Sequence, residues 1–250
     1  MSHRFFIPPD WLTPPTVTLR GDIARQVKTV LRLRTGGTII VLDNSGMEWQ
    51  VRLTQFNRDS VEGQIISQQA AQGEPSLHLT LYQGTLKGQK FEWVLQKGTE
   101  LGVSRFVPTI CQRSVVNEVK ALVKKRERWQ QIIREAAEQS RRGRLPNLEP
   151  AVPLAEAVRQ AQQAPLILMP WEEATGPSLK TILAGEQFEA AAVFIGSEGG
   201  FTADEAALVR QAGGYVVKLG PRILRAETAG LAVCAALLYE GGEWDCSVAS

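Results

Sequence analysis

Two short apolar runs in the last third of the chain each end in a glycine-rich turn that leads into a helical pattern. The first run, Ala191 to Ile195, is followed by the turn Gly196 to Gly200, and the second, Tyr215 to Leu219, by a turn that begins at Gly220. Apolar runs of this length that alternate with helices are typical of a buried parallel sheet. In such sheets, ligand sites lie at the carboxyl ends of the strands. We therefore expect an α/β fold with a ligand site at these two turns.

The helical pattern after the second turn, Ala226 to Tyr239, is apolar nearly all round, which predicts a helix that is buried on most sides. The loop before it contains Arg222 and Arg225, and Glu227 lies in the first turn of the helix. A favourable interaction with the helix dipole explains why an acidic residue, Glu227, occurs in the first turn. Nothing in the helix itself explains why the two arginines occur in the loop before it. The charged loop is therefore a candidate for a functional role.

A strand–helix–strand unit precedes these turns. The strands are predicted over Leu77 to Tyr82 and Arg105 to Ile110, and the helix over Phe91 to Leu101, with Gly102 as its end. A unit of this kind has a right-handed crossover and parallel strands. Later in the chain, the pattern predicts a long helix over 119–142, a strand over 166–169, and a helix over 202–212 that opens with a capping box of Thr202 and Glu205.

Residues 1–72 have the character of a small β-rich module. Strands are predicted over 38–42, 48–53 and 61–66, and a helix over 22–33. A polar stretch with Gly73 and Pro75 follows and predicts a linker over 73–76. We therefore expect two domains, over 1–72 and 77–250.

The net charge of the chain is only +2, so nucleic-acid binding has to come from local clusters of basic residues. Two such clusters lie on the first predicted helix and at the end of the long helix: Arg25, Lys28, Arg32 and Arg34, and Arg141, Arg142 and Arg144. Contact with RNA phosphates and a merely solvated helix surface are both compatible with this pattern.

Cysteine and histidine are too few for a metal site or a histidine-based triad. The three cysteines, Cys111, Cys234 and Cys246, have no metal-ligand spacing, and His3 and His78 are the two histidines. An odd, sparse cysteine count is typical of a reducing compartment, and no apolar run has the length of a membrane span. We therefore expect a cytoplasmic protein without a bound metal.

The turn over 196–200 matches none of three well-known motifs. The dinucleotide fingerprint G-x-G-x-x-G is absent because Glu198 interrupts it, and the phosphate loop G-x-x-x-x-G-K-[ST] is absent as well. The nucleophile elbow G-x-S-x-G fails because Ile195, not glycine, lies two residues before Ser197. A ligand-binding turn and a plain tight turn both remain open.

Together, IGSEGGF at 195–201 and LGPRILRAETA at 219–229 resemble the two signature loops of the SPOUT-class RNA methyltransferases. More narrowly, they resemble the bacterial 16S ribosomal RNA uridine N3-methyltransferase family. Other segments resemble the same family: RFF at 4–6, VLRL at 30–33, FEWVLQKGTELGV at 91–103 and EAAEQSRR at 135–142. The chain departs from the family pattern at Ser197, where proline is usual, and at Gln26 and Gly37 in the N-terminal module.

The resemblance implies a fold and an activity. The fold would be α/β, with a SPOUT-type C-terminal domain containing a deep trefoil knot and an N-terminal PUA-like β-barrel domain that binds RNA. The activity would be S-adenosylmethionine-dependent methylation of N3 of a uridine (uridine 1498) in 16S ribosomal RNA, either as naked RNA or in the small ribosomal subunit. The family also implies a homodimer in which the partner completes each pocket.

The resemblance further implies roles for individual residues. Arg225 would stabilise the charge that develops on the uracil, and Glu198 or Glu227 would act as the base or orient Arg225. The cofactor would be held by Leu168, Met169, Gly196, Ser197, Gly199, Gly200, Leu219, Gly220, Ile223, Leu224, Thr228 and Ala229. The two basic clusters, together with Arg4 and Arg113, would hold the RNA.

Three other functions are compatible with these residues. A catalytically inactive RNA-binding or ribosome-assembly factor with this fold would bind RNA without transferring a methyl group. An α/β enzyme of another class would use the glycine turns for a phosphate-bearing cofactor, without preference for S-adenosylmethionine. A related knotted methyltransferase would act on transfer RNA, although the N-terminal module argues against this function.

Overall fold

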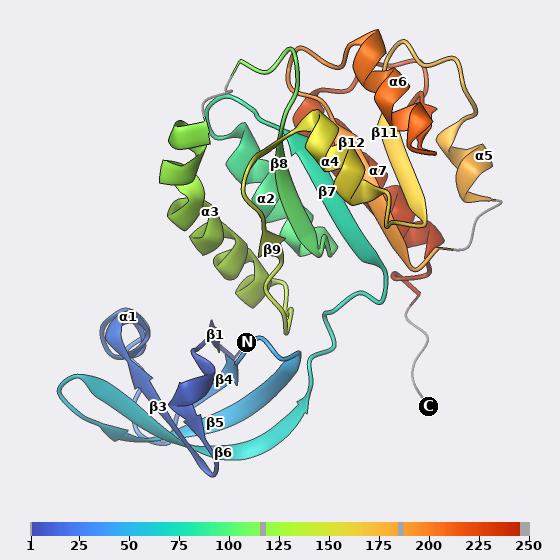
Figure 1. The fold of residues 1–250 in the computed structure, drawn as a ribbon. Helices are drawn as coiled ribbons and strands as arrows, with labels where there is room; N and C mark the ends of the chain where they lie inside the picture. The colour runs from blue at the N-terminus through green and yellow to red at the C-terminus, as the bar shows by residue number, and fades with distance from the viewer. Residues whose placement is uncertain (1, 116–118, 185–187, 246–250) are drawn as a thin grey trace. The chain divides into compact units, whose positions relative to one another are not determined.

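The computed structural model describes residues 2–115, 119–184 and 188–245, which form two compact units (Figure 1). The N-terminal unit comprises Met1–Glu74 together with Arg134–Leu145, and the C-terminal unit comprises Pro75–Ile133 together with Pro146–Ser250. Each unit has its own hydrophobic core. Of the three cysteines, Cys246 lies outside the described residues.

The N-terminal unit contains a six-stranded sheet with the order β1-β4-β5-β6-β3-β2. Its elements are β1 (Arg4–Phe6), the 3-10 turn η1 (Pro9–Trp11), β2 (Leu12–Thr13), β3 (Thr16–Arg20), β4 (Thr38–Leu42), β5 (Met47–Phe56) and β6 (Ser60–Ala70). β1 and β4 pair in parallel, and the other neighbours are antiparallel. Alternation along the strands places residues such as Val17, Leu19 and Val51 in the core.

The three strands predicted in this unit are confirmed, and two of them are longer than expected. β4 covers the predicted residues, whereas β5 and β6 extend beyond theirs. β6 continues to Ala70 because its last residues pair with the start of β5, from Met47 to Gln50. The ladder of backbone hydrogen bonds therefore runs into the polar stretch that precedes the predicted linker.

The helix predicted over 22–33 is divided into two short segments. α1 (Gly21–Arg25) is followed by the π-helical turn η2 (Gln26–Val30), and Arg32 leaves the helical path with a φ of 52°. The Thr29 hydroxyl donates a hydrogen bond to the Arg25 carbonyl oxygen at 2.7 Å. Competition of this side chain for a backbone oxygen, and the stiffness of a β-branched residue, explain why a regular α-helix does not continue here.

The N-terminal unit also includes the last part of the long helix α3 (Val119–Gln139), from Arg134 onward. Arg134 donates to the Phe6 carbonyl oxygen at 2.8 Å, and the Phe6 amide donates to Glu138 Oε1 at 2.9 Å. The helix ends at Gln139 rather than at the predicted residue 142. Arg141 has a φ of 64°, and a left-handed residue of this kind is a common helix end.

The C-terminal unit contains a parallel sheet with the order β10-β8-β7-β12-β11-β13, to which β9 is added beside β8. The strands are β7 (His78–Gly84), β8 (Arg105–Ile110), β9 (Asn147–Leu148), β10 (Val152–Pro153), β11 (Leu166–Pro170), β12 (Ala190–Ile195) and β13 (Tyr215–Val217). The predicted parallel pairing of β7 with β8 is confirmed. Because the pairs are parallel, the turns that follow β7, β11, β12 and β13 lie at one edge of the sheet.

Helices cover both faces of this sheet, as expected for the α/β class (Figure 1). One layer contains α2 (Lys90–Leu101) and α7 (Ala226–Glu240), and the other contains α4 (Leu154–Ala161) and α6 (Ala203–Gln211). A short helix, α5 (Leu179–Leu183), follows β11. Alternate residues of β7 serve the two layers, since Leu81 packs in the first and Tyr82 in the second.

Helix α6 begins with the predicted capping box. The Glu205 amide donates to Thr202 Oγ1 at 3.3 Å, and the Thr202 amide donates to Glu205 Oε2 at 2.9 Å. Glu205 Oε1 also accepts a hydrogen bond from the Gln112 amide at 2.7 Å. This buried carboxylate therefore joins the start of α6 to the loop after β8.

The last helix, α7, is buried or partly buried on most sides, as its apolar sequence predicts, and only a narrow strip of it is exposed. Val233 and Leu237 are buried, whereas Ala232 is exposed and Tyr239 is 67% exposed. A helix that lies on a sheet offers one face to it, and the far face stays in solvent unless another element covers it.

Candidate active site

The glycine turn after β12 is shaped by its own backbone and by the end of β7. The Gly200 amide donates to the Ser197 carbonyl oxygen at 3.0 Å, and Gly200 has a φ of 67°, which favours glycine. Gln83 Nε2 donates to the Gly196 carbonyl oxygen at 3.4 Å. Gly84 packs so closely below the turn that a Cβ on it would lie 2.4 Å from the Ser197 nitrogen.

Arg113 supports the same turn from the loop after β8. The Ser197 hydroxyl donates to the Arg113 carbonyl oxygen at 3.1 Å, and Arg113 Nη1 donates to the Gly199 carbonyl oxygen at 3.1 Å. A proline at position 197 lacks the hydroxyl that makes the first of these bonds. Ser197 therefore attaches the turn through a hydrogen bond, and Arg113 lies at the glycine turn rather than in a basic cluster.

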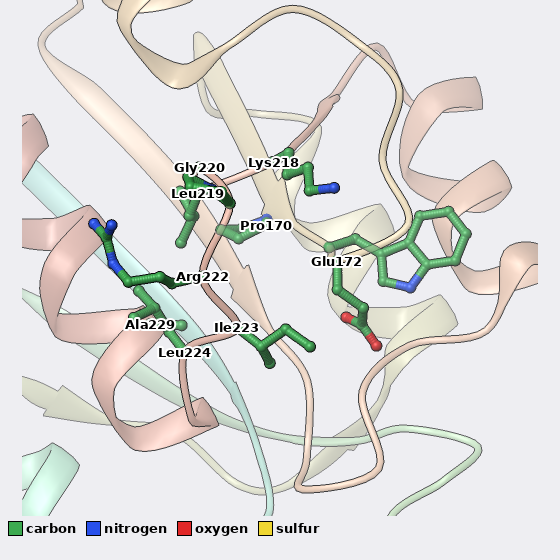
Figure 2. A pocket seen from close by; sticks show the side chains of 11 residues that line it. Pro170, Glu172, Lys218, Leu219, Gly220, Arg222, Ile223, Leu224 and Ala229 are labelled. Atoms are coloured by element: carbon green, nitrogen blue, oxygen red, sulfur yellow. The ribbon is translucent and has the colours of Figure 1, made fainter.

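The loop after β13 forms the wall of a cavity of about 320 Å³ (Figure 2). The remaining walls come from the end of β11, with Pro170 and Glu172, and from Ala229 in α7. Figure 2 shows Arg222 directed away from Glu172, so the loop presents mainly its backbone and the side chains of Leu219, Ile223 and Leu224 to the cavity.

A second cavity, of about 400 Å³, joins the two loops. It is lined by the glycine turn, by residues Ile223 to Glu227 and by Lys90 of α2. Both cavities share Pro170, Glu172 and Ala229 among their lining residues, so they form one continuous site. Their volumes lie in the range of small-molecule sites, roughly 300–1,000 Å³.

A cluster of charged side chains lines the second cavity. Lys90 Nζ lies 3.4 Å from Glu198 Oε1 and 4.0 Å from Glu227 Oε1. The Lys87 amide donates a hydrogen bond to Glu198 Oε1 at 3.0 Å. Glu227 Oε2 is buried and accepts no hydrogen bond from the residues that the structure describes. The two carboxylates are thus close together but have different surroundings.

The surroundings of Glu198 lower its pKa. Partial burial alone would raise this pKa, but the hydrogen bonds from the backbone of Lys87 and from Lys90 outweigh it and hold the pKa below the usual value of 4.5. Glu198 is therefore a weaker base than an ordinary glutamate and is held ionised as part of the turn.

Most of the cofactor residues implied by the resemblance line the two cavities: Gly196, Ser197, Gly199, Gly200, Leu219, Gly220, Ile223, Leu224 and Ala229. Arg225, Glu198 and Glu227, the implied catalytic residues, line the second one. Leu168 and Met169 do not, because β11 continues to Pro170 and both side chains are fully buried in the core. Thr228 is exposed and lines neither cavity.

Two charged residues of the site, Lys90 and Glu172, were missed in the sequence. Lys90 begins α2, and Glu172 follows β11, whose carboxyl end lies at the same edge of the sheet as the glycine turn. The signal for Glu172 was present, since polar residues directly after a buried parallel strand lie at the ligand edge. Nothing local distinguishes Lys90 from other lysines at a helix start.

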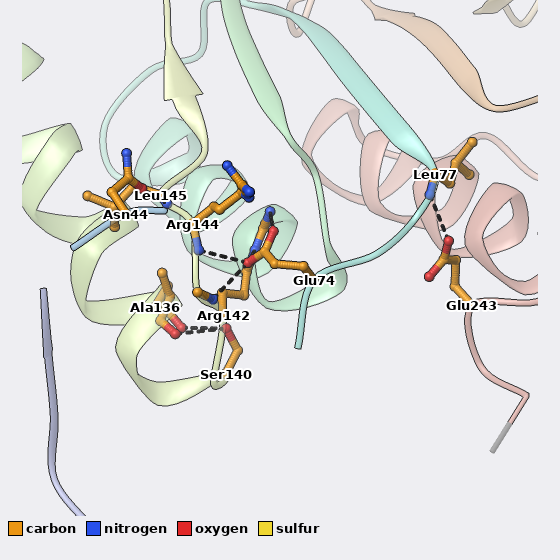
Figure 3. A network of polar contacts seen from close by, with 11 residues as sticks. Asn44, Glu74, Leu77, Ala136, Ser140, Arg142, Arg144, Leu145 and Glu243 are labelled. Atoms are coloured by element: carbon orange, nitrogen blue, oxygen red, sulfur yellow. Dashed lines mark hydrogen bonds and ion pairs between the residues drawn. The ribbon is translucent and has the colours of Figure 1, made fainter. Parts of the chain in front are cut away.

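Arg142, expected to contact RNA, is instead buried in the N-terminal unit (Figure 3). Its side chain is only 3% exposed, and its Nε and Nη2 atoms donate to the Glu74 carboxylate at 3.2 Å and 3.1 Å. The amides of Gly143 and Arg144 also donate to Glu74, at 2.9 Å and 3.0 Å. Arg142 therefore stabilises the loop after α3 and does not present its guanidinium to solvent.

The other basic residues of this unit divide into bound and exposed ones. Arg4 is mostly buried and forms an ion pair with Glu48, and Lys28 donates to the carbonyl oxygens of Asn57 and Arg58. Among the residues of this unit that were expected to contact RNA, the side chains that remain exposed are Arg25, Arg32, Arg34, Arg141 and Arg144. These five have the accessibility that a phosphate contact requires.

Comparison with known protein families gives the class of protein to which this chain belongs. The family model described as an RNA methyltransferase domain matches residues 73–238, which include β7 through most of α7. The chain is therefore an RNA methyltransferase.

Relatives and solved structures that resemble this chain narrow this class to one family. A ribosomal RNA small subunit methyltransferase E of Bacillus subtilis (strain 168) is 32% identical over 232 residues, covering 90% of this chain and 91% of the relative. The protein of the same name from a Synechocystis strain is 34% identical, covering 92% of this chain and 75% of the relative. A crystal structure of the Neisseria gonorrhoeae protein of this name, bound to S-adenosyl methionine, has a TM-score of 0.84 at 32% identity over 96% of this chain and 98% of that one. The chain belongs to the ribosomal RNA small subunit methyltransferase E family.

The described part of the chain lacks two kinds of feature. No group of histidine, cysteine and acidic side chains there is arranged to hold a metal ion. None of the helices described is long and apolar enough to cross a membrane.

Proposed function

We propose that this protein uses S-adenosylmethionine to methylate N3 of a uridine in 16S ribosomal RNA, in the cytoplasm. The observation that carries the proposal is that the two glycine-rich loops, Arg225 and the carboxylates of Glu198 and Glu227 line one continuous site. The relatives' names give the small-subunit ribosomal RNA as their substrate, and one relative of the same fold is bound to S-adenosyl methionine. Uridine 1498 is the target that the family resemblance favours.

The residues of the site fit this cofactor. Leu219, Ile223 and Leu224 offer apolar walls for an adenosine, and the Glu172 carboxylate is an acceptor for a hydroxyl or ammonium group. A Cβ on Gly200 would lie 2.9 Å from Glu172 Oε1, so the glycine keeps the space beside this carboxylate open. When bound, S-adenosylmethionine supplies a methyl group on a cationic sulfur atom.

The chain's own residues prepare the nucleophile. Uridine N3 carries a proton and reacts only after losing it, so the site needs a base at this nitrogen. Glu198 and Glu227 are the carboxylates of the cavity, and Arg225 stabilises the negative charge that moves onto a uracil oxygen. Since N3 lies on the pairing edge of the base, the uridine must be unpaired or turned out of its stack.

The N-terminal unit is proposed to be a PUA-like RNA-binding domain over residues 1–72, with a linker over 73–76 and the methyltransferase domain over 77–250. Its mixed six-stranded sheet and its exposed Arg25, Arg32 and Arg34 support this proposal. Exposed arginines neutralise phosphates and position RNA without reading its sequence.

A deep trefoil knot of the SPOUT type is proposed for the C-terminal unit. Support comes from the path of the chain after β13, the edge strand. From there it returns as α7 to pack with Leu81 of β7 and Ile195 of β12, strands in the middle of the sheet. Such a path is what a threaded last helix requires, and true knots are otherwise very rare in proteins.

A homodimer is proposed as the working form. The support is the apolar far face of α7, where Leu231, Ala232 and Tyr239 are at least partly exposed. An exposed apolar helix face favours association with a second copy of the chain. In this arrangement the partner completes each site.

The test is methyl transfer from tritiated S-adenosylmethionine to small ribosomal subunits from a strain that lacks the activity, and to naked 16S RNA, followed by nucleoside analysis. We expect labelled 3-methyluridine, and a loss of about 100-fold or more in the rate for Arg225→Ala. Arg210→Ala, on the surface helix α6, serves as the matched control.

The same experiment separates the competing functions. Cofactor and RNA binding without any labelled nucleoside would identify a catalytically inactive assembly factor. Binding of phosphate-bearing nucleotides in preference to S-adenosylmethionine would indicate an enzyme of another class. Label in transfer RNA alone would indicate a different substrate.

A further inference from the structure

Lys90 is the common neighbour of the two carboxylates that could serve as the base. Its Nζ lies 3.4 Å from Glu198 Oε1 and 4.0 Å from Glu227 Oε1, and all three side chains line the same cavity. The three come from different elements: the start of α2, the turn after β12 and the start of α7. Only the tertiary fold brings them together.

The oxygens of the two carboxylates differ in their contacts. Glu198 Oε1 already accepts the Lys87 amide at 3.0 Å and faces Lys90, so this carboxylate connects the glycine turn to the start of α2. Glu227 has the less exposed side chain, 15% against 26%, and its buried Oε2 accepts no hydrogen bond from the described residues. A buried oxygen without a donor is costly, which is understandable if the substrate supplies the donor.

We propose that Glu227 is the general base of the reaction, that Lys90 is a positioning residue that holds the Glu227 carboxylate in place, and that Glu198 maintains the turn. This inference rests on the proposed function. The proton of uridine N3 passes to the Glu227 carboxylate, and the electron pair of the broken N–H bond stays on N3. That pair forms the bond to the methyl carbon, whose bond to sulfur breaks with its electrons left on sulfur. Water later takes the proton from Glu227.

The charges around Glu227 give Lys90 a measurable role. The charged groups that line the cavity with Glu227 are Lys90 from α2, Glu198 from the turn, Glu172 from the end of β11 and Arg225 from the loop before α7. The Nζ atom of Lys90 lies 4.0 Å from Glu227 Oε1, close enough for an ion pair. Without Lys90, the ion pair that holds the Glu227 carboxylate at this position is lost.

The test compares variants of the full-length protein in the methyl-transfer assay, with 3-methyluridine as the product. We expect Glu227→Gln to lower kcat by about 100-fold or more and Glu198→Gln by less than about tenfold. Lys90→Met should lower kcat by about tenfold while KM for the RNA stays within about twofold, and Lys90→Arg should restore kcat. Glu240→Gln, at the far end of α7, and Lys97→Met, on the far turn of α2, are the matched controls. Calorimetry with S-adenosylmethionine checks that each variant is folded and binds the cofactor.

The possible outcomes separate the inference from the proposed function. If the wild type makes 3-methyluridine and Glu227→Gln stays within about threefold of it, the assignment of the base is wrong and the proposed function stands. A wild-type kcat for Lys90→Met would remove the role of Lys90. If the wild type makes another methylated nucleoside, the proposed function and this inference both fail.

Discussion

Gly84 and Ser197 are in such close contact that a Cβ built on Gly84 would lie 2.4 Å from the Ser197 backbone nitrogen. Gly84 ends β7, and Ser197 lies in the glycine turn after β12. The absence of a side chain at Gly84 therefore allows the glycine turn, which is far away in the sequence, to pack against the end of β7.

Replacing Gly84 with alanine should disturb this turn. The added methyl group meets backbone atoms of Ser197 and Gly196, which cannot rotate away as a side chain would. We expect Gly84→Ala to lower the free energy of unfolding by about 1–3 kcal/mol and to weaken binding of S-adenosylmethionine. Denaturant unfolding and calorimetry measure the two effects. Gly230→Ala is the comparison, because there the nearest atom is the side-chain Oε1 of Gln83 at 3.2 Å. Equal effects of the two substitutions would contradict the prediction.

Arg142 and Glu74 should matter for stability rather than for RNA binding. Arg142→Ala removes the guanidinium from a nearly buried ion pair and leaves the Glu74 carboxylate without it. We expect a loss of about 3 kcal/mol in the free energy of unfolding, against less than about 0.5 kcal/mol for the exposed Arg144→Ala. Urea unfolding measures both. A normal stability for Arg142→Ala, together with weakened RNA binding, would restore the phosphate-contact role expected from the sequence.

Glu138 should make the stability of the N-terminal unit depend on pH. Burial raises the pKa of Glu138 above its usual 4.5, although the Phe6 amide and Arg134 act against this. Because the folded state holds this proton more tightly, the stabilisation is full below the unfolded pKa and is lost as the pH rises through the folded pKa. Glutamine keeps an oxygen acceptor for the Phe6 amide without a charge to bury.

We therefore expect Glu138→Gln to raise the free energy of unfolding at pH 7 by about 1 kcal/mol, with the gain disappearing below about pH 4. Thermal and urea unfolding across this pH range provide the measurement. Glu135→Gln, on the exposed side of the same helix, is the control. If Glu138→Gln raised the free energy of unfolding equally at pH 7 and below pH 4, burial of the Glu138 charge would not be the cause of the gain.

Cys111 and Cys234 should be unreactive in the folded protein. Burial raises the pKa of both thiols to about 12, and at Cys111 the nearby Glu205 adds to this effect. In a Cys246→Ser variant, we expect labelling by a thiol reagent at pH 8 to be at least about 100-fold slower in buffer than in urea. Labelling of either cysteine at the rate of a free thiol would mean that its surroundings open readily.

Elements that depend on near neighbours were predictable from the sequence. The capping box of Thr202 and Glu205 spans a single helical turn, and both of its hydrogen bonds are present. The end of β12 at Ile195 and the glycine turn after it follow from an apolar run and from the lack of side chains at Gly199 and Gly200. Propensity and turn chemistry act over a few residues, so a local pattern is enough to predict them.

Some local patterns were misleading because the tertiary environment decided whether a side chain is buried or exposed. Basic residues at the end of α3 predict a solvated or RNA-binding surface, but Glu74 draws Arg142 into the interior. Leu168 and Met169 have the position expected of a strand end, yet β11 continues to Pro170 and leaves them in the core. In both cases the deciding contact is with residues distant in the sequence. Glu74 is 68 residues from Arg142, and β11 pairs with the later strands β12 and β13.

The sequence by itself determined the α/β class, the two glycine-rich loops and the family to which they belong, because each depends on short, contiguous patterns of residues. Only the tertiary structure decided which charged groups meet in the site. Lys90 and Glu198 are 108 residues apart, and their contact exists because parallel strands bring the start of α2 and the turn after β12 to one edge of the sheet. The distance between two such groups depends on packing and strand register throughout the sheet, which no local pattern of residues specifies.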